Sequence, residues 1–447
     1  MSPGRIACTF LCLAWSLHAA QIGDKNFTAD DLFQMTHIWK VELTFTPDQW
    51  KHLPAHRVSA GSGQTLLGAP GLRNGLTGAA GMTFDWVHAD LKIDGIPFHN
   101  IAVRYKGNGT YRRGISTGKV SLKLDLNKYV KGQKLAKLDK INLASEIADG
   151  TYMNEDISYR LFREAGVPAP RTSYARVYIT IAGEKPQYYR GLYSLTEDVD
   201  ESYIDHWFHS HDGALFKPVM YAPFTYMGED WKNYVQAYAP KLDLTDAQKR
   251  RLIEFTKLVN NAADADFNAK IGDYVDLDEF ARFLAVSVWA MDFDSILFNG
   301  QNYYVYQNPK TNKYVFLPWD QDETFAKVGF GGNREPDLNI LQPYRPGGNK
   351  FLARMLAVPA FRSLYLKYIA EYNGNLLRPE RLAAMVDELA PIIRPAVKEE
   401  STEALAMFDA GAAGESFRMP PWGAIRPLKP FAEMRSKIVA EQLKKAR

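Results

Sequence analysis

The stretch that most constrains this chain is NYYVYQNPKTNKYVFLPWDQDETF, residues 302–325. Aromatic and polar residues alternate on both sides of the turn NPKTNK, which predicts a two-stranded hairpin. The two ends of a hairpin are neighbours in space. We therefore expect the carboxylates after the second strand, Asp320, Asp322 and Glu323, to lie close to the residues that precede the first strand.

A second polar group precedes the hairpin. Asp292 and Asp294 follow the apolar segment FARFLAVSVWAM, where a carboxylate faces the unfavourable end of the helix dipole. Because the hairpin returns the chain to where it began, we expect four side chains to converge: Asp294, Asn302, Asp320 and Asp322. Carboxylates this close repel each other, and a divalent cation relieves the repulsion. Oxygen ligands with an amide carbonyl suit Mg²⁺ or Mn²⁺ rather than zinc. The alternative is a solvated loop whose acids never converge.

Strand patterns dominate the first half of the chain and helix patterns the second. KVELTF and ADLKIDGIPFHNIAVRY alternate, the latter around the hairpin signal DG. TDAQKRRLIEFTKLVNNA and DLDEFARFLAVSVWAM are helical and begin with acids. The Gly-rich stretch 59–81 predicts a mobile surface loop. With 447 residues, 46% of them hydrophobic, we expect an α+β chain with a strand-rich lobe over about 36–200 and a helical lobe over 201–447.

The N-terminus, MSPGRIACTFLCLAWSLHAA, resembles a secretory signal peptide over residues 1–20. The alternative is a buried or disordered N-terminus. Both cysteines, Cys8 and Cys12, lie inside this segment, so the expected mature chain, 21–447, has no thiol for disulfides, metal binding or catalysis. No later segment resembles a membrane span. The net charge is only +3 without a basic run, which argues against nucleic acid as a partner.

The order of these parts indicates a class of enzyme. An Asp, an Asn several positions later, a hairpin and then a metal-binding Asp form the catalytic arrangement of protein kinases. The segments KVSLKL, NEDISYRLF and GLYSLTEDVD supply a lysine strand, an acidic helix and an acidic hinge, as in the small lobe of such enzymes. The usual HRD and DFG strings are absent, so this is not an ordinary eukaryotic-type kinase.

At these residues the sequence resembles the CotH-type atypical kinases, the family of the bacterial spore-coat kinase. The likeness runs from about Val41 to Gly331 and is most specific in DFDSILFNGQNYYVYQNPKTNKYVFLPWDQDETF. VRYKGNGTYRRGISTGKVSLKLDL, LFREAGVPAPRTSYARVYITI and YRGLYSLTEDVD resemble the lysine-strand segment, the helix-to-strand passage and the hinge of that family. The resemblance implies a kinase-like fold that uses ATP and Mg²⁺ (or Mn²⁺).

The resemblance also implies roles for the residues of the hairpin region. Asp294 would take the proton of the acceptor hydroxyl, with Asp292 as its competitor. Asn302 would bind metal, with Asn299 as the alternative. Asp320 would be the principal metal ligand and Asp322 the second.

Further roles fall on the strand-rich lobe. Lys119 would hold the nucleotide phosphates and so belongs to the catalytic set, with Asp156 as its partner. Lys106 or Lys123 could share that role, since position 106 holds Lys where the family often has Arg. Glu197, in the hinge segment, is a cofactor-binding candidate, and the alternative is an exposed hinge residue.

Two hypotheses follow. The first is an exported Ser/Thr kinase, found in the periplasm, at the cell surface or secreted, whose substrate is an exported or surface protein. The second is a non-catalytic envelope or surface protein that uses a kinase-like fold for binding.

Overall fold

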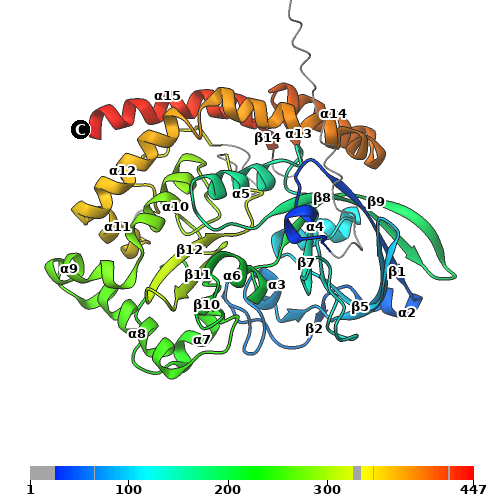
Figure 1. The fold of residues 1–447 in the computed structure, drawn as a ribbon, viewed down its shortest axis with the longest axis horizontal. Helices are drawn as coiled ribbons and strands as arrows, with labels where there is room; N and C mark the ends of the chain where they lie inside the picture. Colours follow the sequence, from blue (N-terminus) through cyan, green and yellow to red (C-terminus); the bar gives the residue numbers. More distant parts are fainter. Residues whose placement is uncertain (1–25, 65, 326–333, 346, 421–422, 447) are drawn as a thin grey trace, which may run out of the picture.

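The computed structural model describes residues 26–64, 66–325, 334–345, 347–420 and 423–446. The expected signal peptide, 1–20, lies outside the described residues. In Figure 1 a strand-rich lobe occupies the right-hand side, helices occupy the left-hand side, and the C-terminal helices run across the top of both. The fold is α+β with the two-lobed arrangement that the sequence predicts.

Seven strands of the first lobe close into a barrel, in the order β1-β4-β5-β6-β7-β9-β8. Strands β1 and β8 pair in parallel, whereas their neighbours pair antiparallel. The predicted hairpin at Asp94–Gly95 is confirmed, since both residues have positive φ, 45° and 84°, between β4 and β5. The barrel strands are β1 (Ile38–Phe45), β4 (Val87–Ile93), β5 (Ile96–Tyr105), β6 (Leu122–Asp125), β7 (Lys140–Ala144), β8 (Thr172–Ile181) and β9 (Lys185–Glu197).

Side chains that alternate along the strands fill the interior of the barrel. In β4 every second residue is buried, and Val41, Leu43 and Leu91 belong to one buried hydrophobic cluster with residues of the other strands. This lobe also contains several short helices and strands outside the barrel, and one longer helix, α5, that packs against the second lobe. They are α1 (Ala29–Leu32), α2 (Pro47–His52), β2 (His56–Arg57), α3 (Leu76–Ala79), β3 (Met82–Thr83), α4 (Gly109–Thr117) and α5 (Asn154–Glu164).

The second lobe surrounds a larger hydrophobic core that includes Phe280, Trp289 and Phe316. Asp198–Asp200 lead into it from β9. Its helices are α6 (Glu201–Phe208), α7 (Lys232–Tyr238), α8 (Asp246–Asn261), α9 (Asp264–Tyr274), α10 (Leu277–Trp289), α11 (Lys350–Ala357), α12 (Pro359–Gly374), α13 (Pro379–Glu400), α14 (Thr402–Ala413) and α15 (Leu428–Ala446). Its strands are β10 (Ala214–Phe216), β11 (Tyr303–Asn308), β12 (Lys313–Pro318), β13 (Phe417–Met419) and β14 (Gly423–Ile425).

The hairpin that opened the sequence analysis is β11–β12. Its register pairs Tyr303 with Pro318 at the open end and Asn308 with Lys313 at the turn. Strand β10 adds to the β11 edge and completes a three-stranded sheet. The hairpin therefore delivers Asn302 and Trp319 side by side, as the alternating pattern predicts.

The Gly-rich stretch 59–81 differs from the expected mobile surface loop. It contains α3, and its part from Gly71 to Gly75 lines a cavity between the lobes. Asn74 donates a hydrogen bond to the carbonyl oxygen of Gln236 in α7 at 2.5 Å, and Gln236 donates to Leu72 O at 2.9 Å. These cross-lobe contacts hold the stretch in place, and composition alone could not reveal them.

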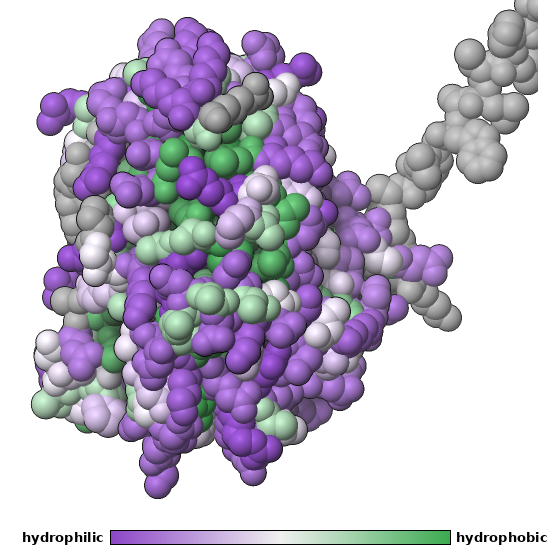
Figure 2. All heavy atoms as spheres, turned by 90° about the vertical axis from the view of Figure 1, so that its left-hand side faces the viewer, coloured by the Kyte–Doolittle hydropathy of each residue, from purple (hydrophilic) through white to green (hydrophobic). Residues whose placement is uncertain are grey.

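The outer surface of the helical lobe is mixed. Seen from the left-hand side of Figure 1, Figure 2 shows mostly hydrophilic side chains around a hydrophobic group in the upper middle. Within the described residues, every helix is too short or too polar to cross a bilayer.

Candidate functional site

A cavity of about 690 Å³ lies between the two lobes. The barrel contributes residues of β5, β6 and β7, and the chain from β9 to α6 contributes Asp198 and Asp200. The helical lobe contributes Lys217, Gln236 and Lys241. Charged and amide side chains from both lobes therefore face one space.

The open end of the β11–β12 hairpin forms one wall of this cavity. Asn302, Asp320 and Asp322 line it, and Trp319 donates its backbone N–H to Asn302 O at 3.2 Å. Asn302 and Asp320 both have φ of 58°, the left-handed conformation in which Asn and Asp are enriched. The chain thus turns sharply at each end of the hairpin, and the structure brings these three side chains together.

Asp294 accepts hydrogen bonds from the residues that lead into the first strand of the hairpin. Its Oδ1 accepts hydrogen bonds from Asn299 Nδ2 and Gln301 Nε2, both at 2.6 Å, and its Oδ2 accepts one from Asn302 Nδ2 at 2.8 Å. Burial, followed by the charge of Glu323, raises the pKa of Asp294 to about 7. The carboxyl of Asp294 therefore gains or loses its proton near neutral pH.

Asp292 occupies a different environment. It is 2% exposed, and its Oδ2 accepts a hydrogen bond from Gln321 Nε2 at 3.0 Å. Burial and the neighbouring Asp294 raise its pKa well above the ordinary value. Neither aspartate lines the cavity itself. Asp294 contacts two residues that do, Gln301 and Asn302, so the geometry favours Asp294 as the residue in contact with the cavity wall.

Helix α5 positions the acidic loop after the hairpin. Asp320 donates its backbone N–H to the hydroxyl oxygen of Tyr159 at 2.9 Å, and Ser158 Oγ lies 3.0 Å from Thr324 Oγ1. Both α5 residues are buried. The conformation of the loop that carries Asp320 and Asp322 is therefore tied to the helix that crosses from one lobe to the other.

Three lysines of the barrel lobe line the cavity, Lys106, Lys123 and Lys140. Lys106 Nζ lies 4.9 Å from the centre of the Trp319 ring, which is a cation–π contact. Trp319 directly precedes Asp320, so this contact holds the lysine near the acidic loop. Burial lowers the pKa of Lys106, and the charges of Asp320 and Glu155 oppose that shift. Lys123 Nζ forms an ion pair with Asp198 at 2.6 Å.

Asp198 is the counter-charge at the hinge. Burial alone would disfavour its charged form, but the Lys123 ammonium and the hydrogen bonds from Lys123 and Asn142 lower its pKa to about 2. It is ionised throughout the neutral range, and it fixes Lys123 on the wall of the cavity.

Lys119 does not line this cavity. Its Nζ forms an ion pair at 2.7 Å with Glu400, the last residue of α13, and lies 4.5 Å from the Tyr152 ring centre. The expected partnership with Asp156 is wrong: Asp156 is fully buried and accepts a hydrogen bond from Ser194 Oγ at 3.2 Å. The reason is local, since β6 begins only at Leu122 and the alternation that groups 119 with 121 and 123 holds only inside a strand.

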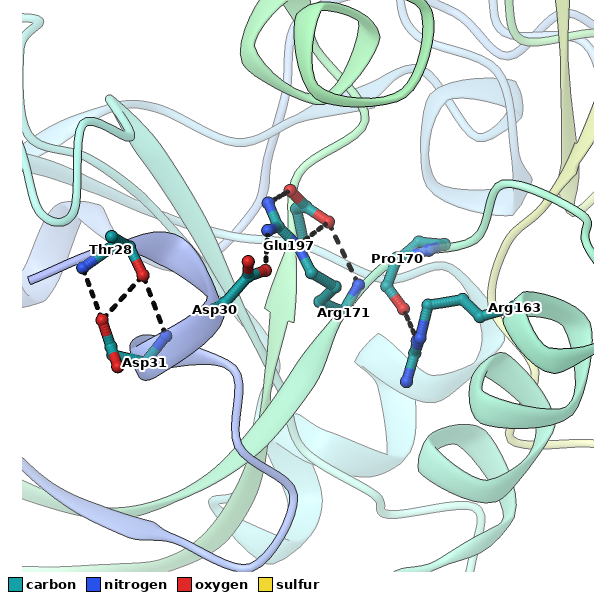
Figure 3. Close-up of polar contacts among 7 residues, drawn as sticks. All are labelled: Thr28, Asp30, Asp31, Arg163, Pro170, Arg171 and Glu197. Atoms are coloured by element: carbon teal, nitrogen blue, oxygen red, sulfur yellow. Dashed lines mark hydrogen bonds and ion pairs between the residues drawn. The ribbon is translucent and has the colours of Figure 1, made fainter. Parts of the chain in front are cut away.

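Glu197 also lies away from the cavity and is not an exposed hinge residue. It is 1% exposed and forms an ion pair with the Arg171 guanidinium, which also binds Asp30 at 2.6 Å (Figure 3). A second bond runs from Arg171 Nε to Glu197 Oε2 at 3.1 Å. Glu197 therefore joins the end of β9 to the start of β8 and to α1.

Sequence reasoning missed several residues of the site, among them Lys217, Glu155 and Glu146. Lys217 follows β10, and its Nζ lies 4.9 Å from the Trp319 ring centre and 5.0 Å from that of Tyr304. Glu155 and Glu146 line the cavity and are 3% and 4% exposed. The helix start NEDI could have signalled Glu155, whereas Lys217 and Glu146 stand in no motif.

The donor set fits a hard divalent cation. Asn302 uses its amide nitrogen on Asp294, which leaves Oδ1 for a ligand, and both carboxylate oxygens of the buried Glu146 lack a hydrogen-bond partner. In the part of the chain that the structure describes, no three His, Cys, Asp or Glu side chains form a ready-made metal cage. Proteins hold Mg²⁺ through one or two carboxylates, waters and substrate phosphates, and Asn302, Asp320 and Asp322 could supply the protein oxygens.

Two lobes joined by a hinge, a cavity between them, and an Asp–Asn–hairpin–Asp wall facing lysines define a kinase-like protein. The sequence model of the family described as CotH kinase protein matches residues 103–435. The chain belongs to this family.

Similar proteins come from bacteria and fungi. The chain is 26% identical over 262 residues to the inner spore coat protein H of Bacillus subtilis (strain 168), covering 58% of this chain and 68% of that protein. It is 23% identical over 282 residues to the invasin CotH7 of Rhizopus delemar, covering 60% and 44%. It is 24% identical over 274 residues to the spore coat protein homolog 1 of the same fungus, covering 58% and 43%. The chain thus spans about two thirds of the bacterial relative and less than half of the fungal ones.

Proposed function

We propose that this protein is an exported, ATP- and Mg²⁺-dependent kinase that transfers the γ-phosphate to Ser or Thr hydroxyls of secreted or surface proteins. The observation that carries the proposal is the cavity wall in which Asn302, Asp320 and Asp322 face Lys106 and Lys123. Phosphoryl transfer requires positioning and charge neutralisation more than covalent chemistry, and this wall offers both.

The side chains divide the work. Asn302, Asp320 and Asp322 would hold Mg²⁺, which neutralises phosphate charge when bound. Lys106 and Lys123, rather than Lys119, would bind the phosphates. The acceptor hydroxyl oxygen bonds to the γ-phosphorus, the bond from that phosphorus to the bridging oxygen breaks, and ADP leaves.

Asp294 would receive the hydroxyl proton. Its Oδ1 accepts two amide hydrogen bonds and its Oδ2 only one, so Oδ2 retains a lone pair for the acceptor. A pKa of about 7 lies near the operating pH, where general-base catalysis works best.

Export is part of the proposal. Residues 1–20 would be a signal peptide, and 21–447 the mature kinase domain. The names of the relatives, spore coat proteins and an invasin, favour a surface or extracellular setting. Mass measurement of the exported protein should show a chain that begins near Gln21, and retention of Met1 in the exported protein would contradict this part.

The function itself is tested by two measurements on the mature chain. MgATP at a hundred times its Kd should stabilise the fold by about 2.7 kcal/mol, EDTA should remove this effect, and Asp320→Ala should abolish it without unfolding the ligand-free protein. Labelled phosphate should then pass from ATP to exported proteins. If MgATP neither stabilises the protein nor is consumed, a non-catalytic envelope protein is the better description.

A further inference from the structure

The cavity is lined by cationic side chains beyond the two lysines proposed to bind the nucleotide phosphates. Besides Lys106, Lys123 and Lys140, it is lined by four cations that we name the cationic cluster: Arg73, Arg104, Lys217 and Lys241. In the described part of the chain, none of the four forms an ion pair with a carboxylate, whereas Lys119, Lys123 and Lys140 each have one. Carboxylates line the same cavity, Asp198 and Asp320 among them, but the cluster's members make no direct ion pair with them among the described residues.

Two of the acids near the cluster already form ion pairs with other lysines. Asp198 pairs with Lys123 at 2.6 Å, and Asp200 pairs with Lys140 at 3.4 Å. The cluster's members repel one another instead. Burial and then Arg104 lower the pKa of Arg73 to about 9, and burial and then Lys241 lower the pKa of Lys217.

Arg73 is held in this unfavourable position by uncharged partners. Its guanidinium donates to Gly107 O and lies 4.4 Å from the Phe84 ring centre, while its Nε is buried without a partner. The neighbouring Asn74 is bound to Gln236 of α7 across the cavity. The hydrogen bond to Gly107 O thus holds Arg73 in place, although the charge of the nearby Arg104 repels it.

Cations that share a cavity and have no direct ion-pair partner can bind an anion, and arginine forks match the oxygens of phosphate. We propose that the cationic cluster is a phosphate-binding subsite, distinct from the metal-facing wall of Asn302, Asp320 and Asp322. Arg73 belongs to the Gly-rich stretch 59–81 and lies before residues 103–435, the range that matches the family.

The phosphate could come from either of two sources. It is the terminal part of the nucleotide, or it is a phosphate already carried by the acceptor. Only this choice rests on the proposed function, because anion binding by the cluster does not require phosphoryl transfer.

Calorimetry with inorganic pyrophosphate in metal-free buffer tests the subsite directly. We expect Arg73→Ala and Lys241→Ala each to weaken binding about tenfold, the loss of one charge-assisted hydrogen bond. Lys131→Ala and Arg418→Ala remove exposed charges elsewhere and should leave binding unchanged. Lys241 is itself exposed, so its variant remains folded even if Arg73→Ala loosens the Gly-rich stretch.

A second titration separates the sources. Pyrophosphate is titrated into protein saturated with Mg²⁺ and a non-hydrolysable ATP analogue. Competition, with a matching loss of analogue affinity in both variants, assigns the subsite to the nucleotide, whereas simultaneous binding assigns it to the acceptor. Absent pyrophosphate binding, or equal affinity in cluster variants and controls, overturns the subsite. Loss of phosphate transfer with pyrophosphate binding intact would instead contradict the proposed function alone.

Discussion

At the scale of single residues, Asp294 and Asp292 differ in what surrounds them rather than in chemistry. Asp294 accepts hydrogen bonds from three amides, two of them in the cavity wall, and Asp292 is buried behind Gln321. We expect Asp294→Asn to reduce phosphate transfer by about 10²–10⁴, the usual share of acid–base catalysis. The affinity for MgATP should change little, because Asp320, Asp322 and the lysines remain. Turnover and calorimetric affinity are the two measurements.

Asp292→Asn is the matched control for this prediction. It makes the same chemical change two residues earlier, at a side chain that binds Gln321 rather than an amide of the cavity wall. If Asp292→Asn silences transfer and Asp294→Asn does not, Asp292 is the base. If both leave transfer intact, neither aspartate handles the proton.

Asp156 should make stability depend on pH. It is fully buried, its Oδ2 has no partner, and burial above all raises its pKa from 3.8 to about 7. Between pH 4 and 7 the folded state keeps a proton that the unfolded state has lost, so the free energy of unfolding falls as pH rises through this window and levels off above it. Urea unfolding from pH 5 to 8 measures this loss.

Asp156→Asn should flatten that dependence, because an amide does not ionise. Each pKa unit corresponds to about 1.4 kcal/mol, so the variant should gain at least this much relative to wild type between pH 5 and pH 8. Equal slopes in the two proteins would show that Asp156 titrates normally in the folded state.

At the scale of elements, the hairpin was predictable and its supports were not. Alternation around NPKTNK identifies β11 and β12, and hairpin closure alone brings Asn302 to Asp320. The position of Lys119 could not be predicted in this way. The sequence pattern gives the alternation of a strand but not the residue at which the strand begins, and β6 begins only at Leu122. Lys217 and Arg73 reach the cavity through contacts between segments far apart in the chain, which no local pattern records.

Helix α5 should position Asp320 through the hydroxyl of Tyr159. Tyr159 accepts the backbone N–H of Asp320 at 2.9 Å, so Tyr159→Phe leaves that donor without its partner. We expect a loss of about 0.5–1.5 kcal/mol in stability and a weaker dependence of ATP binding on Mg²⁺. Metal titrations followed by thermal unfolding measure both.

Tyr303→Phe is the control for Tyr159→Phe. Tyr303 is also fully buried, but its hydroxyl has no hydrogen-bond partner among the described residues. Removing that hydroxyl should be neutral or slightly stabilising and should leave metal dependence unchanged. Equal effects of the two substitutions would mean that the Tyr159 bond does not position Asp320.

At the scale of the whole molecule, the C-terminal helices brace the two lobes against each other. The end of α13 reaches the barrel, where Glu400 accepts from Lys119 Nζ, from the Tyr152 hydroxyl at 2.9 Å and from Leu192 N–H at 2.5 Å. Tyr189 adds a bond to Ala396 O at 3.0 Å. Figure 1 shows α13 and α14 crossing above β8 and β9. Lys119 thus belongs to a contact between lobes.

This contact gives the last prediction. The Lys119 and Glu400 side chains are only 11% and 12% exposed, so Glu400→Ala leaves a buried ammonium without its counter-charge and should cost about 3–5 kcal/mol in the free energy of unfolding. Lys119→Met combined with Glu400→Gln removes both charges and should recover most of that loss, because no unpaired charge remains buried. Urea unfolding of the single and double variants measures the coupling.

The same variants decide what Lys119 does. If Lys119 only braces the lobes, the Lys119→Met, Glu400→Gln protein should bind MgATP with nearly wild-type affinity, whereas Lys106→Ala should weaken that binding without a comparable loss of stability. If the double variant is stable but no longer binds MgATP, Lys119 holds the phosphates after all. In that case the cavity lined by Lys106 is not the whole nucleotide site, and the C-terminal helices act on binding as well as on stability.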